Sequence, residues 1–178
     1  MIFKLFARKS DVDVVERLYA AIMAAARRPA LYQGRYSIPD TLEGRFDALI
    51  LHSYLVSRRL AALPEPAPRL AQDLTDRVFF GFDRALREMG VGDLAVPKRM
   101  KKLGADYAGR CAAYEAALGQ GEAALAEALA RNVYGKAEAS VAAPLARYVL
   151  NAEAVLAATP YSTFERGEAP LPEPTDAA

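Results

Sequence analysis

The stretch RLAQDLTDRVFFGFDRALREMG, residues 69–90, decides the fold class because its apolar residues recur at every third or fourth position. That spacing places them in one stripe along an α-helix. The stripe consists of Leu70, Leu74, Val78, Phe82, Ala85 and Met89. The proline-rich PEPAP before this stretch and Gly90 at its end are typical helix boundaries. We therefore predict an amphipathic helix over residues 69–89 that packs its stripe against other helices.

The same periodicity extends in both directions along the chain, where alanine is abundant and runs of β-branched residues are absent. It predicts further helices over 11–28, 42–63, 97–118, 122–134 and 138–158, with Asp40 or Thr41 as the cap of the second. We expect an all-α fold, a compact bundle of about six helices. The expected division of the chain is an N-terminal segment 1–10, a helical domain 11–160, and a proline-rich acidic tail 161–178 that is predicted to be disordered.

The composition limits the classes of function. The 178 residues have a formal net charge of +1, so the chain as a whole has no attraction for polyanions. One cysteine excludes an intramolecular disulfide, and one histidine excludes a zinc cluster of Cys and His ligands within one chain. We see no secretory signal and no apolar run of about 18 residues that would span a membrane. We therefore expect a cytoplasmic location, with contact to the inner face of the cytoplasmic membrane left open.

Two side chains are candidates for catalytic groups, Cys111 and His52. Cys111 falls on the apolar stripe of its helix, where a free cysteine usually acts as a small hydrophobe. His52 has Ala48 and Val56 four positions away on either side, so no carboxylate of its own helix orients it. A di-iron bundle needs two Glu-x-x-His pairs, and this chain has one histidine. We therefore expect a protein that is not an enzyme and has no cofactor or metal, with His52 at the core edge or at a partner contact.

A basic cluster follows the helix over 69–89. The stretch VPKRMKKL, residues 96–103, puts four cations into the first turns of a helix that opens at Pro97: Lys98, Arg99, Lys101 and Lys102. Each cation there opposes the helix dipole and costs about 0.3–1 kcal/mol. Asp106, four positions after Lys102, is the one acidic residue placed to relieve them. The cluster is either a solvated helix start or a contact for an anionic partner, such as phospholipid headgroups, ribosomal RNA or an acidic protein face.

Four blocks of sequence together resemble the ubiquinol–cytochrome c chaperone family. They are YSIPDTLEGRFDALILH (36–52), RALREMGVGDLAVPKRMKKL (84–103), YAGRCAAYEAAL (107–118) and LAEALARNVYG (125–135), within a similarity that covers about residues 20–135. The resemblance implies a non-catalytic role. Mitochondrial members bind newly made cytochrome b, assist assembly of the cytochrome bc1 complex, and work with a small partner protein near the ribosomal tunnel exit. Because no long targeting extension precedes these blocks, we expect a bacterial relative.

The resemblance also suggests which residues serve contact or fold. The blocks contain Thr41, Arg87 and Gly90 in addition to our candidates for binding a client or partner. Those candidates are Tyr36, Asp40, Arg45, His52, Lys98, Arg99, Lys101, Lys102, Tyr107, Arg110 and Tyr114.

The three functional hypotheses make different structural predictions. A chaperone for a membrane-protein client predicts an exposed apolar groove beside the surface from Lys98 to Arg110. A carrier for a lipid or a quinone predicts a closed apolar cavity of about 300–1,000 Å³. An enzyme predicts a cleft that holds His52 next to a carboxylate.

Overall fold

The computed structural model describes residues 9–135 and 137–175, and these ranges contain α-helices, one 3₁₀-helix and no strand. The elements are α1 (Lys9–Ala26), η2 (Pro29–Tyr32), α2 (Leu42–Ala61), α3 (Ala67–Glu88), α4 (Val96–Leu118), α5 (Glu122–Asn132), α6 (Ala139–Ala158) and α7 (Tyr161–Glu165). The all-α prediction is confirmed, and the six long helices begin and end within about two residues of their predicted bounds. Most of the predicted N-terminal segment 1–10 lies outside the described residues.

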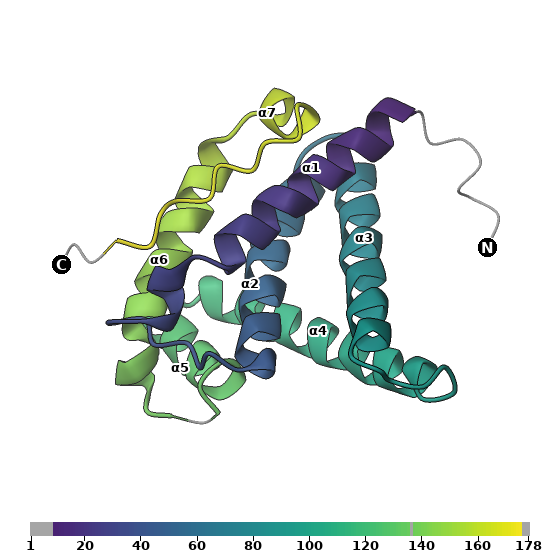
Figure 1. The fold of residues 1–178 in the computed structure, drawn as a ribbon. Coiled ribbons are helices and arrows are strands. Elements are labelled where there is room, and N and C mark those ends of the chain that lie inside the picture. Colours follow the sequence, from purple (N-terminus) through teal and green to yellow (C-terminus); the bar gives the residue numbers. More distant parts are fainter. Residues whose placement is uncertain (1–8, 136, 176–178) are drawn as a thin grey trace.

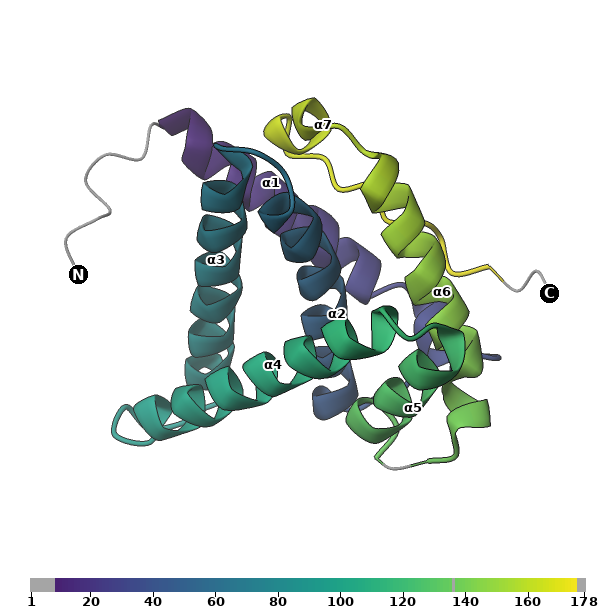
Figure 2. The same cartoon turned by 180° about the vertical axis from the view of Figure 1, so that it is seen from behind.

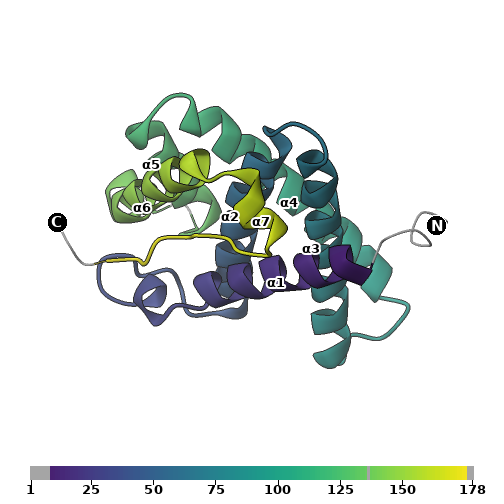
Figure 3. The same cartoon turned by 90° about the horizontal axis from the view of Figure 1, so that it is seen from above.

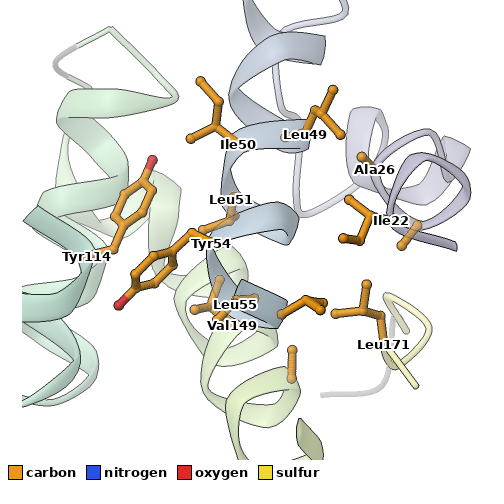
Figure 4. Packing of buried hydrophobic residues seen from close by; sticks show 14 of the residues in the cluster. Ile22, Ala26, Leu49, Ile50, Leu51, Tyr54, Leu55, Tyr114, Val149 and Leu171 are labelled. Atoms are coloured by element: carbon orange, nitrogen blue, oxygen red, sulfur yellow. The ribbon is translucent and has the colours of Figure 1, made fainter. Parts of the chain in front are cut away.

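Helix α2 forms the centre of the molecule. On one side it packs against α1 and α3, and on the other it packs against α4 and α6 (Figures 1 and 2). Figure 4 shows how its side chains divide: Leu49 lies toward Ile22 of α1, whereas Tyr54 lies toward Tyr114 of α4. Every residue of α2 from 47 to 56 is buried, which explains why its sequence reads as almost continuously apolar.

The start of α2 depends on two local features. The Thr41 hydroxyl accepts a hydrogen bond from the amide of Gly44 at 3.1 Å, as predicted for an N-cap residue. At Gly44, a Cβ would lie 2.0 Å from the carbonyl oxygen of Pro39. A glycine is therefore required there because the incoming chain passes too close for any side chain.

The C-terminal segment differs from the prediction of disorder. Phe164 and Leu171 are buried in the core, and residues 161–175 run beside α6 and past α1 (Figures 1 and 3). Arg28 holds this extended chain, since its guanidinium donates to the carbonyl of Leu171 at 3.2 Å and pairs with Glu173 at 2.9 Å. The Tyr36 hydroxyl donates to the carbonyl of residue 175 at 3.0 Å. The prediction of disorder was wrong over 161–175, because polar side chains from distant parts of the chain form hydrogen bonds with the backbone of this segment. Residues 176–178 lie outside the described ranges.

Helix α6 is, among the described residues, the one helix long and apolar enough to cross a membrane by length and composition alone. Here it packs against α5 and α2, with Leu145, Val149 and Ala152 fully buried. In this structure α6 is therefore a helix of the bundle.

Candidate functional site

A hollow with a volume of about 470 Å³ opens between α1, α2 and α3. Most of the side chains around it are apolar or aromatic, and Leu42 at its edge is 49% exposed. We call it the apolar groove. It is lined by Tyr19, Met23, Ala26, Arg27, Leu42, Arg45, Phe46, Leu49, Gly81, Phe82 and Ala85.

One wall of the groove depends on a glycine within α3. A Cβ at Gly81 would lie 2.3 Å from the hydroxyl oxygen of Tyr19. The Tyr19 ring is in turn covered by the guanidinium of Arg77, whose central carbon is 4.0 Å from the ring centroid. A glycine in a helix interior costs about 1 kcal/mol relative to alanine. We conclude that the glycine leaves room for the Tyr19 hydroxyl against α3, at some cost to local helix stability.

Two basic residues, Arg27 and Arg45, edge the groove. Arg45 pairs with Asp40 at 2.7 Å, and its guanidinium lies 5.0 Å from the ring centroid of Tyr32. Burial, partly offset by Arg45, raises the pKa of Tyr32. Two of our candidates, Asp40 and Arg45, therefore meet at this edge and form a polar border for an apolar surface.

A row of aromatic rings leads from the groove through the bundle to α4. The centroid distances are 5.1 Å from Phe46 to Phe82, 5.8 Å from Phe82 to Phe79, and 5.2 Å from Phe79 to Tyr107. Tyr107 is partly buried and lines a second hollow of about 310 Å³ between α2, α3 and α4. Cys111 lines the same hollow, and burial raises the pKa of its thiol to about 11. At neutral pH this cysteine is therefore a neutral thiol rather than a nucleophilic thiolate.

Three candidates, Tyr36, His52 and Tyr114, are buried in the core. Their burial gives them a role in the fold, and it argues against the predicted role as contacts for a client, because they offer almost no surface to a partner. His52 Nδ1 lies 2.7 Å from the carbonyl oxygen of Ala48, and Nε2 lies 2.8 Å from the hydroxyl oxygen of Tyr148. Nδ1 therefore donates and Nε2 accepts. Burial lowers the pKa of His52 to about 4, so the ring is neutral at pH 7. The enzyme hypothesis required a carboxylate next to His52, and neither of these two hydrogen-bond partners is one.

Arg110 points inward rather than toward solvent. Its guanidinium pairs with Asp47 of α2 at 2.8 Å, and both side chains are largely buried. Burial raises the pKa of Asp47 to about 6, and the positive charge of Arg110 counteracts this rise. The pair ties α4 to α2, so Arg110 is a fold residue. Sequence analysis missed Asp47, although an aspartate inside the apolar run FDALIL was a signal for a buried ion pair.

The basic cluster lies apart from the apolar groove, because none of the residues that line the groove belongs to α4. The apolar groove therefore does not border the surface from Lys98 to Arg110, and Tyr107 of that surface lines the second hollow instead. The cluster instead forms, with the end of α3 and the connecting loop, a projecting corner that we call the hairpin tip, residues 89–102 (Figures 1 and 2). Its four cations, Lys98, Arg99, Lys101 and Lys102, are exposed. Lys102 pairs with Asp106 at 2.7 Å, as the spacing predicted.

Comparison with known proteins places this structure beside one group. A family model described as Ubiquinol-cytochrome C chaperone matches residues 35–171. Among solved structures, the crystal structure of the Cbp3 homolog from Brucella abortus is similar, with 37% sequence identity, a TM-score of 0.86 and coverage of 100% of both chains. A comparison with curated proteins gives no match. The structural alignment therefore extends over the whole chain.

Proposed function

Because the chain belongs to the ubiquinol–cytochrome c chaperone family, we propose that it is an assembly chaperone of the cytochrome bc1 complex with newly made cytochrome b as its client. The family implies a non-enzymatic role. We propose that an apolar segment of the client binds in the apolar groove while the client awaits its partners in the complex.

The observation that carries this proposal is an apolar groove with a charged edge on the surface of an otherwise well-packed bundle. A helix binds such a groove by its apolar face, with side chains about three and four positions apart inserted between the walls. The wall from α1 contains Met23, whose flexible side chain adapts to apolar groups of different shape. The edge contains Arg27 and Arg45, which fit the polar end of a membrane segment.

The groove also bears on the carrier hypothesis. Its volume falls in the range of about 300–1,000 Å³ that is usual for small-molecule sites. A carrier, however, must shield an apolar ligand from water, and this hollow is open, with Leu42 half exposed at its edge. An open groove suits a segment of polypeptide better than an enclosed lipid or quinone.

Site-specific photo-crosslinking of the full-length protein, in cells that assemble the cytochrome bc1 complex, tests the proposal. A photoreactive residue at Leu42 reports on the groove, and one at Val141 of α6 is the control because it is similarly exposed outside the groove. We expect a cytochrome b adduct from position 42 and none from position 141. Equal adducts from both positions, or an adduct with no cytochrome b from position 42, would contradict the proposal.

A variant that fills the groove gives a second reading. Ala85→Phe adds a ring to the α3 wall, where alanine now leaves space. We expect the adduct from position 42 to fall about tenfold, since occupying the groove removes contacts worth about 1.4 kcal/mol. Urea unfolding of Ala85→Phe checks that the fold is kept. Lipid bound to the wild-type protein in native mass spectra, and displaced by this variant, would instead favour the carrier.

A further inference from the structure

The hairpin tip exposes apolar side chains to solvent. Leu94 in the loop between α3 and α4 is 99% exposed, and Met89 at the end of α3 is 46% exposed. The other large apolar side chains on the described surface reach at most 57% exposure. A single exposed leucine is common on protein surfaces. Leu94 is unusual because exposed cations of the basic cluster lie close to it in the sequence.

Those charges have no use within the fold. Lys98, Arg99 and Lys101 are exposed and form no ion pair with any described residue. The cations of α3 just before the loop are different, since Arg84 pairs with Glu88 at 2.7 Å and Arg87 pairs with Asp83 at 2.7 Å.

The acidic residue in the loop before α4 does not relieve the three unpaired cations. Asp93, the one acidic residue of the loop, pairs at 2.6 Å with Arg87, which it shares with Asp83, and not with a cation of α4. The three free cations at the start of α4 therefore face solvent and oppose the dipole of their own helix. This arrangement is unfavourable for the isolated protein and favourable next to an anionic surface.

The shape of the hairpin tip limits the kinds of partner that can bind there. Figures 1, 2 and 3 show the hairpin tip projecting from the bundle, with no other element over it. An apolar apex flanked by cations is the pattern of elements that rest in a membrane interface, with the apolar group among the headgroups and the cations against phosphates. RNA would satisfy the cations but offers nothing to a leucine at the apex.

We propose that the hairpin tip docks the protein on a bilayer containing anionic lipid, with Leu94 inserted at the interface and Lys98, Arg99 and Lys101 against the lipid phosphates. This docking goes beyond the proposed function and does not depend on it, because it requires no client. It places the protein peripherally on a membrane surface.

Sedimentation of the full-length protein with vesicles tests the docking. The vesicles are phosphatidylcholine with about 30% phosphatidylglycerol, compared with phosphatidylcholine alone, at about 0.1 M salt. The triple variant Lys98→Gln, Arg99→Gln, Lys101→Gln should lose about 100-fold in binding to the anionic vesicles, since each cation near such a surface is worth about fivefold. The matched control removes the same charge from α3, α5 and α6: Arg69→Gln, Arg131→Gln and Arg147→Gln. The control should stay within about threefold of the wild type, because distant charges are screened.

A second pair of variants separates lipid from nucleic acid. Leu94→Gln keeps every charge and should lower binding to anionic vesicles about tenfold, because it withdraws one apolar side chain from the interface. Val141→Gln is the control at a similarly apolar exposed position away from the tip. Equal losses for the triple variant and its charge control would overturn the proposal. A second result would also overturn it: Leu94→Gln binds vesicles as the wild type does, while the triple variant loses binding to single-stranded RNA. The vesicles carry no client, so either result leaves the groove proposal to its own test.

Discussion

Acidification from pH 7 to pH 5 should destabilise the wild-type protein through its one histidine. His52 is fully buried, and burial lowers its pKa from 6.5 to about 4. Between these two values the unfolded chain binds a proton that the folded chain does not, so the free energy of unfolding falls as pH falls. The stability that His52 contributes is complete above pH 6.5 and is lost progressively toward pH 4.

The magnitude follows from the two pKa values. At 1.36 kcal/mol per pKa unit, the loss between pH 7 and pH 5 is about 2 kcal/mol. Asp47 acts in the opposite direction, because its pKa is raised from 3.8 to about 6 and its folded form takes up a proton first as pH falls. The wild-type profile alone therefore mixes two opposed contributions. The difference between the wild type and His52→Gln removes the Asp47 contribution, since both proteins keep that carboxyl group.

Urea unfolding followed by circular dichroism, at intervals from pH 7 to pH 5, measures that difference. We expect the stability advantage of the wild type over His52→Gln to shrink by about 2 kcal/mol across the range. Tyr148→Phe is the control: it loses about 1 kcal/mol at every pH through its missing hydrogen bond, and it keeps the wild-type slope because the histidine remains. Nuclear magnetic resonance of the one imidazole gives a direct check. A measured pKa near 6.5, or parallel profiles for the wild type and His52→Gln, would refute the reasoning.

Three further substitutions test the packing by urea unfolding at pH 7. Gly44→Ala should lower the free energy of unfolding by about 1–3 kcal/mol, because its methyl group meets the carbonyl of Pro39 and neither backbone can move freely. Phe164→Ala should cost about 3–5 kcal/mol and loosen the C-terminal segment, which proteolysis after residue 160 would reveal, since this ring is fully buried. Arg110→Met should cost about 3–5 kcal/mol at pH 7 by leaving Asp47 buried without its counter-charge, and less at pH 5, where that carboxyl group is protonated.

The helices could be predicted from sequence because the signals that define them are local. The apolar stripe and the flanking breakers predicted a helix over 69–89, and α3 is Ala67–Glu88. The cap at Thr41 and the ion pair between Lys102 and Asp106 follow from spacings of three and four residues. Each of these features depends on neighbours within about one turn of helix, so one sequence is enough to find them.

The features that failed depend on contacts between distant parts of the chain. Phe164 and Leu171 are too sparse to predict order, and the side chain that fixes their segment, Arg28, comes from the first loop. Several polar and aromatic residues of the family blocks were predicted to be surface contacts. One of them, His52, lies in the core, where the Tyr148 hydroxyl of α6 forms a hydrogen bond with its Nε2. The groove was expected beside α4 and lies between α1, α2 and α3, since the crossing of α1 over α3 decides where apolar side chains stay uncovered.

One helix connects the two proposed surfaces and determines how they would work together. Phe82 of α3 lines the groove, and Met89 at the end of the same helix belongs to the hairpin tip. Seven residues of helix separate them, a rise of about 10 Å. With the tip at the headgroups, the groove would therefore open about one headgroup layer from the apolar interior, where a membrane segment first becomes available. Because α3 is unbroken over its 22 residues, docking of the tip would hold the groove at a constant distance along this helix from the docking point. Under this proposal the unpaired cations at the start of α4 would serve both effects, which would explain why they stand at an unfavourable position in the helix.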